Sequence, residues 1–122
     1  MAQDTGIQGN IISAPAAVAR MVEDIVGCKW SLAVLAAIRK DIARPGAIRR
    51  SLAGISTKVL NERLVKMLRY DLLVKQIYPE VPPRVEYRLT PFGERFVVLL
   101  DQIEALQAQF DAARMDAPGP KR

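Results

Sequence analysis

A group of polar and charged residues near the middle of the chain has the composition of a base-reading surface. The group comprises Ser56, Thr57, Lys58, Asn61 and Glu62. Side chains of these types can hydrogen-bond to the donor and acceptor edges that bases present in the major groove of DNA. If this segment forms the first two turns of a helix, these side chains lie close together on it. We therefore predict that this group contacts bases, with Ser56 as the N-cap of the helix.

Basic residues on both sides of this group can neutralise a phosphate backbone. Affinity for DNA that does not depend on sequence comes mostly from lysine and arginine side chains at phosphates. The candidates are Arg49, Arg50, Lys58, Lys66 and Lys75. Arg84 lies at the expected tip of a hairpin, from which a guanidinium can enter a minor groove. For each residue taken singly, a solvated surface position is an equal alternative, and only the whole set favours DNA.

The charge of the chain is unevenly distributed, which favours an acidic partner. The 122 residues carry a formal charge of +5. Residues 39–88 hold 12 basic and 5 acidic side chains, whereas residues 91–112 hold one basic and four acidic ones. This division is expected when only the middle region meets phosphate, although a basic surface alone is common among soluble proteins.

The sequence offers no residue set for catalysis, metal binding or membrane insertion. The chain has no histidine and one cysteine, Cys28, so it can form neither an internal disulfide nor a zinc site. The sequence contains no Gly-x-Ser-x-Gly nucleophile turn and no phosphate-binding loop motif. The longest apolar run, residues 32–38, is far shorter than the roughly 18 residues of a membrane span, and no signal peptide is visible. We expect a cytoplasmic protein that is not an enzyme and has no cofactor and no membrane partner.

Periodicity and turn residues predict a mainly α-helical domain with one small β-hairpin. Helices are expected at residues 15–26, 29–40, 45–52, 56–70 and 91–112, and strands at 73–78 and 84–89. Residues 1–14 are expected to form a flexible arm and residues 113–122 a disordered tail, which leaves residues 15–112 as the domain. This order predicts a winged helix-turn-helix, with a three-helix core, a wing and a long C-terminal dimerisation helix.

The helix at residues 56–70 is the candidate recognition helix. Its apolar and charged residues fall on opposite sides: Leu60, Leu64, Met67 and Leu68 against Lys58, Glu62, Val65, Lys66 and Arg69. An ordinary solvated surface helix is the alternative, and the turn before this helix and the hairpin after it favour groove binding.

The hairpin supplies the candidate wing. In its second strand Val85, Tyr87 and Leu89 are expected to face inward and Arg84, Glu86 and Arg88 outward. The connecting loop, residues 78–84, is stiffened by three prolines and is expected to touch the adjacent backbone or minor groove.

Six apolar residues of the last helix form a stripe, at alternating steps of four and three. The stripe consists of Phe92, Phe96, Leu99, Ile103, Leu106 and Phe110. Its length of roughly 28 Å exceeds what a domain of this size can cover, so we predict that part of it meets a second subunit. Packing only on the first helix of the same protomer is the alternative.

Three segments together resemble the HxlR-type family of winged helix-turn-helix regulators. They are Gly27-Cys28-Lys29-Trp30, residues 54–64, and residues 78–93 with the run Pro-Pro-Arg-Val-Glu-Tyr. The resemblance implies a homodimeric bacterial or archaeal transcription regulator that pairs through its first and last helices. It also implies binding to a palindromic promoter site in double-stranded DNA, and a response to redox stress or to a small-molecule effector.

The chain departs from the family pattern at positions that bear on sensing. Ala17 stands where redox-sensing relatives carry a cysteine, and Cys28 stands where the family commonly has glycine. Cys28 is a candidate redox sensor because neighbouring Lys29 favours its thiolate, and a small buried thiol beside Trp30 is the alternative. Asp71 replaces a glycine after the recognition helix, and aspartate tolerates such a turn.

A second function from another class fits the same surface. The chain would then be a winged-helix module that binds a protein partner and meets nucleic acid only incidentally. DNA binding that lacks sequence preference and vanishes by about 200 mM salt would favour this alternative.

Overall fold

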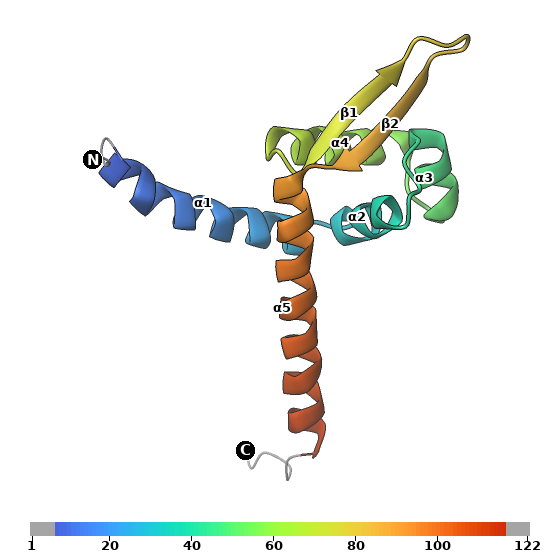
Figure 1. Cartoon of the computed structure of the whole chain (residues 1–122). Coiled ribbons are helices and arrows are strands. Elements are labelled where there is room, and N and C mark those ends of the chain that lie inside the picture. The colour runs from blue at the N-terminus through green and yellow to red at the C-terminus, as the bar shows by residue number, and fades with distance from the viewer. Residues whose placement is uncertain (1–6, 117–122) are drawn as a thin grey trace.

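The computed structural model describes residues 7–116, which form five helices and a two-stranded hairpin (Figure 1). The helices are α1 (Ile7–Gly27), α2 (Ser31–Arg39), α3 (Pro45–Ser51), α4 (Thr57–Arg69) and α5 (Pro91–Asp116), and the strands are β1 (Leu73–Tyr78) and β2 (Arg84–Leu89). The order of elements is the predicted one, and both strands have the predicted bounds.

Both long helices extend further than the sequence indicated. Helix α1 begins at Ile7, so the expected start at Pro15 is wrong and residues 7–14 are helical. Proline is common in the first turn of a helix, which made Pro15 a misleading start signal. Helix α5 runs to Asp116, four residues beyond the expected end at 112. The rest of the predicted arm and tail, residues 1–6 and 117–122, lies outside the described residues.

The core lies where helices α2, α3 and α4 meet the base of the hairpin. Val34 from α2, Ile48 from α3 and Leu60 from α4 are at most 1% exposed. The same cluster includes Ile25 of α1, Leu73 of β1 and, from the first turns of α5, Phe96, Val97 and Leu100. Burial of these apolar side chains is the main stabilisation of the domain.

The hairpin is tied to the core along one edge and at its base. Strands β1 and β2 pair antiparallel, with Leu73 opposite Leu89 and Tyr78 opposite Arg84. On the outer edge of β2, the N–H of Tyr87 donates to the carbonyl of Ala43 at 2.9 Å. The base of the hairpin is therefore fixed on the segment between α2 and α3, while its tip projects from the body (Figure 1).

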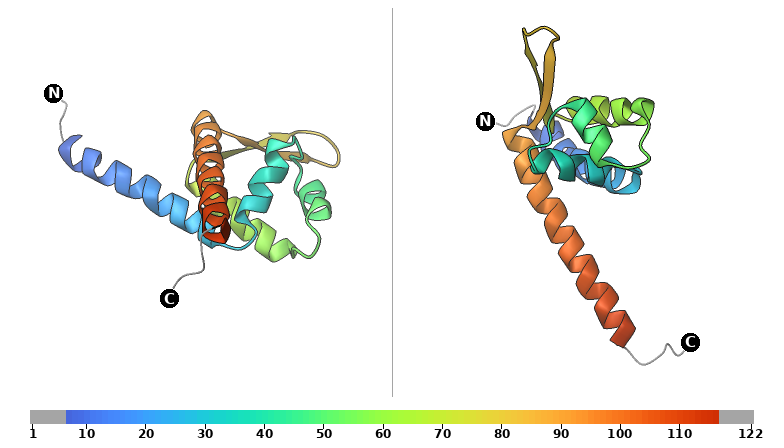
Figure 2. Two further views of the ribbon diagram at one scale, coloured as in Figure 1. Left: turned by 90° about the horizontal axis from the view of Figure 1, so that it is seen from below. Right: turned by 90° about the vertical axis from the view of Figure 1, so that its right-hand side faces the viewer.

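Helix α1 and the C-terminal half of α5 also project from the body. The right-hand view of Figure 2 shows α5 leading away from the core, on the side opposite the hairpin. None of the described helices is both long and apolar enough to span a membrane.

Candidate nucleic-acid interface

A short helix, a tight turn and a capped second helix build the candidate interface. Gly54 in the turn has a φ of 97°, which a residue without Cβ adopts without strain. Ser56 then caps α4, because its Oγ accepts a hydrogen bond from the N–H of Val59 at 3.1 Å. The predicted cap is confirmed.

The inner side of α4 is buried and its first two turns present an open outer side. Leu60, Leu64 and Met67 are at most 1% exposed and fix the helix on the core. The predicted base-reading residues are all exposed: Ser56, Thr57, Lys58, Asn61 and Glu62. Neither the Lys58 nor the Asn61 side chain makes a hydrogen bond or ion pair with another described residue. Both side chains are thus free to meet a partner.

Exposed cations surround this helix on two sides. Arg49 and Arg50 are exposed in the last turn of α3, and Lys75 is exposed on β1. Their exposure agrees with the prediction, and their contact with phosphate remains a prediction.

Lys66 lies in a different environment from the one expected. Its Nζ donates to Asp24 Oδ1 at 2.8 Å and lies 3.3 Å from Cys28 Sγ, so this lysine faces α1 and is half-buried. The Tyr70 hydroxyl donates to the other oxygen of Asp24. The hydrogen bond from Lys66, followed by that from Tyr70, lowers the pKa of the Asp24 carboxyl below its usual 3.8. The expected outward position of Lys66 is wrong. The periodicity of one helix does not show which part of its polar side a neighbouring helix, here α1, will cover.

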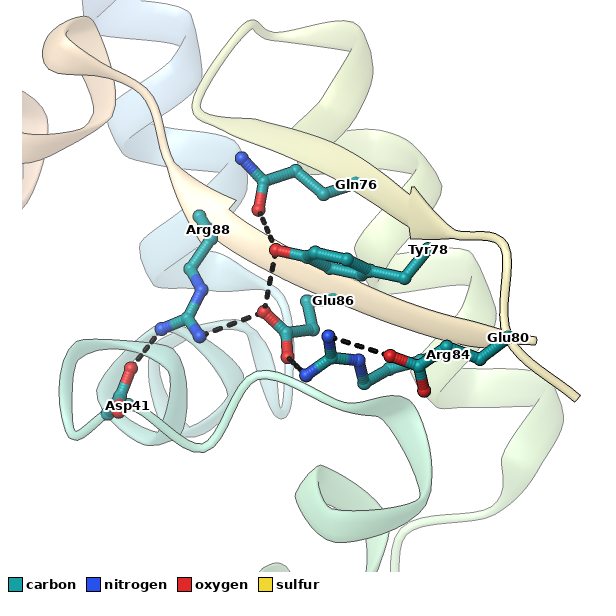
Figure 3. Close-up of polar contacts among 7 residues, drawn as sticks. All are labelled: Asp41, Gln76, Tyr78, Glu80, Arg84, Glu86 and Arg88. Carbon is teal, nitrogen blue, oxygen red and sulfur yellow. Dashed lines mark hydrogen bonds and ion pairs between the residues drawn. The ribbon is translucent and has the colours of Figure 1, made fainter. Parts of the chain in front are cut away.

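The hairpin carries an ionic cluster, the wing network, that extends from β2 to the end of α2 (Figure 3). It consists of Asp41, Gln76, Tyr78, Glu80, Arg84, Glu86 and Arg88. Arg84 bonds Glu80 at 3.0 Å and Glu86 at 3.2 Å, and its guanidinium carbon lies 3.9 Å from the centre of the Tyr78 ring. Arg88 joins Glu86 at 3.0 Å and also pairs with Asp41. Arg84 is therefore held within the hairpin rather than extended into solvent.

Glu86, like Arg84, is covered by its neighbours although sequence analysis placed it outward. Strand alternation put it outward, yet it is 8% exposed because two arginines and a tyrosine cover it. The hydrogen bond from Arg88 is the largest of the effects that lower the pKa of Glu86. The one available signal was the spacing Arg84-x-Glu86-x-Arg88, which puts opposite charges on one face of a strand.

The apolar stripe of α5 divides into a covered half and an open half. Phe96 is 3% exposed, Phe92 and Ile103 are half-buried against the core, and Leu99 is half-buried. Beyond them Leu106 is 67% and Phe110 55% exposed. On the covered half, a bidentate ion pair between Arg39 and Asp101, with both bonds at 2.8 Å, fastens α5 to α2.

Cys28 is a partly exposed free thiol at the junction of α1 and α2. In the part of the chain that the structure describes, no three side chains of histidine, cysteine, aspartate or glutamate come together to hold a metal.

Residues 25–115 match the family model of the HxlR-like helix-turn-helix. Two relatives are named uncharacterized HTH-type transcriptional regulators. One, sll1512 of Synechocystis, is 39% identical over 65% of this chain and 58% of its own length. The other, YtfH of Escherichia coli K12, is 37% identical over 65% of this chain and 66% of its own length.

The fold also matches solved structures of transcriptional regulators. A protein from Enterococcus faecalis V583, assigned to the MarR family of transcriptional regulators, superposes with a TM-score of 0.72 at 28% identity. The superposition covers 95% of this chain and 98% of that one, so it includes the hairpin and the long last helix. The chain has a winged helix-turn-helix fold and belongs to the HxlR-like helix-turn-helix family.

Proposed function

We propose that the protein is a dimeric, sequence-specific DNA-binding transcriptional regulator of the cytoplasm. The observation that carries this proposal is the outer side of α4, where Lys58 and Asn61 are exposed and unengaged by other described side chains. The opposite side of the same helix is fully buried, so the helix is a rigid support for them. A rigid helix with polar residues in its first turns is suited to entering a major groove.

The proposed contacts divide into base-reading and phosphate-binding residues. Thr57, Asn61 and Glu62 face the bases from the start of α4, with Ser56 at the cap. Arg49, Arg50, Lys58 and Lys75 meet the phosphates around them, because all four are exposed. Lys66 is left out of this set because it is bonded to Asp24. The wing loop lies on the adjacent backbone or minor groove.

The proposed homodimer forms through the open half of the apolar stripe. Leu106 and Phe110 are more than half exposed on a helix segment that projects from the body (Figure 2). Large apolar side chains in a row on an exposed helix are typical of a protein interface. A second copy of the chain would cover them and repeat the recognition helix, which suits a palindromic site.

The test is a binding titration with fragments selected from genomic DNA. Lys58→Ala is expected to weaken binding and to reduce the slope of log affinity against log salt by about 0.9, the value for one lost phosphate contact. Asn61→Ala is expected to reduce discrimination between selected and random-sequence duplexes, because a lost base contact costs about 1–3 kcal/mol of discrimination.

Asp111→Asn serves as the control, because it changes one charge near the C-terminal end of α5 and is expected to bind like wild type. If the Lys58→Ala variant has the affinity and salt slope of the wild type, Lys58 does not contact DNA. Equal wild-type affinity for selected and random duplexes would instead favour a protein-binding module.

A further inference from the structure

The wing network contains more negative than positive charge. Asp41, Glu80 and Glu86 supply three carboxylates, and Arg84 and Arg88 supply two guanidinium groups. In the loop between the strands the side chain of Val81 is fully exposed and carries no charge. The hairpin therefore does not present a free cation at its tip, although a wing on DNA needs one to gain from the phosphate charge.

We propose that Glu80 occupies the phosphate-binding side of Arg84 and competes with DNA for it, while Glu86 positions the same guanidinium from the inside. This inference rests on the proposed DNA-binding function. By pairing with Arg84, Glu80 limits the affinity of the protein for DNA, and Glu86 is a positioning residue for the same guanidinium.

The two carboxylates differ in how firmly they hold Arg84. The Glu86 side chain is 10% exposed and is also bonded by Arg88, so its position is fixed from both sides. The Glu80 side chain is 49% exposed and lies in the loop. Ion pairs with exposed partners are weak, so an incoming phosphate can replace Glu80 more readily than Glu86.

Arg84 is already oriented for such an exchange. The Tyr78 ring covers one face of its guanidinium, and Glu86 holds Nη1 while Glu80 holds Nη2. A phosphate that displaced Glu80 would find Nη2 presented by a preorganised group, which lowers the entropy lost on binding. Arginine forms charge-assisted hydrogen bonds with phosphate as it does with carboxylate, so the exchange replaces the bond to Glu80 with one of the same kind.

The experiment measures binding of Glu80→Gln to a selected genomic duplex over a range of salt concentrations. With the competitor removed, affinity is expected to rise about fivefold. The salt slope is expected to become steeper by about 0.9, as for one added phosphate contact. Asp111→Asn makes the same change in net charge away from the wing and is expected to show neither effect.

Two further variants locate the effect on Arg84 and Glu86. Adding Arg84→Ala to Glu80→Gln is expected to abolish the gain. Glu86→Gln also adds one unit of positive charge, yet it is expected to bind no tighter than wild type because Arg84 loses its inner support. A gain in Glu86→Gln equal to that in Glu80→Gln would overturn the positioning role.

The inference and the proposed function fail in different ways. If wild type binds the duplex and Glu80→Gln matches Asp111→Asn in affinity and slope, competition at Arg84 is wrong. If wild type binds no duplex at low salt, the proposed function itself is wrong.

Discussion

The Asp24 carboxylate joins the first helix to the recognition helix. One oxygen accepts a hydrogen bond from Lys66 at 2.8 Å, and the other accepts one from the Tyr70 hydroxyl. These two bonds stabilise the charged carboxylate and lower its pKa. The same contact raises the pKa of Tyr70 above its usual value of 10.0. The ionised Asp24 carboxylate therefore connects α1 to Lys66 of α4 and to Tyr70 at the end of that helix.

We predict that Asp24→Asn lowers the free energy of unfolding at pH 7 by about 1 kcal/mol, the size typical of a partly exposed pair. A depressed folded-state pKa gives stability that is present above the unfolded pKa and lost as pH falls through the folded pKa. The difference between variant and wild type should thus shrink below about pH 4, near the ordinary value of 3.8. Urea unfolding, followed by circular dichroism at pH 7 and at acidic pH, measures this difference in the free energy of unfolding.

Glu23→Gln is the matched control, since Glu23 is the exposed neighbour on the same helix. An Asp24→Asn variant as stable as Glu23→Gln at pH 7 would show that the contact adds no stability.

At the scale of single residues, a contact between close neighbours in the sequence was easier to predict than a tertiary contact. The cap at Ser56 was predictable because its hydrogen bond is local, made three residues along the chain. The position of Lys66 was not, because its partner Asp24 is brought to it by tertiary packing. For Glu86 the sequence offered only the spacing of opposite charges on one strand face, since Tyr78 comes from the paired strand. Asp71 adopts a φ of 61° after α4, as the sequence analysis allowed for a residue in the place of glycine.

At the scale of elements, the start of α5 is fixed by a close backbone contact. Thr90 Oγ1 accepts a hydrogen bond from the N–H of Gly93 at 2.8 Å and caps the helix. A Cβ at Gly93 would lie 2.1 Å from the carbonyl oxygen of Leu72. The first turn of α5 thus packs directly on the backbone before β1, and only glycine leaves room for it.

Gly93→Ala is predicted to lower the free energy of unfolding by at least about 2 kcal/mol, because backbone rather than a flexible side chain blocks the new methyl group. Thermal unfolding by calorimetry provides the measurement. Gly27→Ala is the control, since a Cβ there meets nothing within 4 Å. Equal melting temperatures of the two variants would contradict the close packing.

The elements themselves were largely predictable. Strong periodicity in α4, β-branched and aromatic residues in both strands, and alternation in β2 gave bounds within one residue of those observed. Helix ends without such a signal were missed, as at Ile7 and Asp116. At the start of α1, Pro15 suggested a false helix start. At the end of α5, Pro118 lies two residues past Asp116 and was the better stop signal than the end expected at residue 112.

At the scale of the whole molecule, the open half of the apolar stripe governs assembly. Leu106 and Phe110 have no cover from the core and lie on a projecting helix (Figure 1). The stripe predicted an uncovered portion, and the structure confirms that its C-terminal part is exposed within one protomer. That a second subunit covers this part remains a proposal, because a single sequence contains no record of its partner.

We predict that Phe110→Glu shifts the protein from dimer to monomer, since burying an unpaired carboxylate in an apolar interface is unfavourable. Light scattering at several concentrations measures the mass. Gln109→Glu adds the same charge at the adjacent exposed position, outside the stripe, and should remain dimeric. A Phe110→Glu protein that remains dimeric would show that the dimer interface lies elsewhere.

The most direct test of the account is a hydroxyl-radical footprint of the wild-type protein on a fragment selected from genomic DNA. Two recognition helices in one dimer should protect two half-sites whose centres lie about 10–10.5 base pairs, or a multiple of that, apart. Protection should weaken at both half-sites in Asn61→Ala. A single protected site, or uniform protection without sequence preference, would contradict the paired recognition helices on which the account depends.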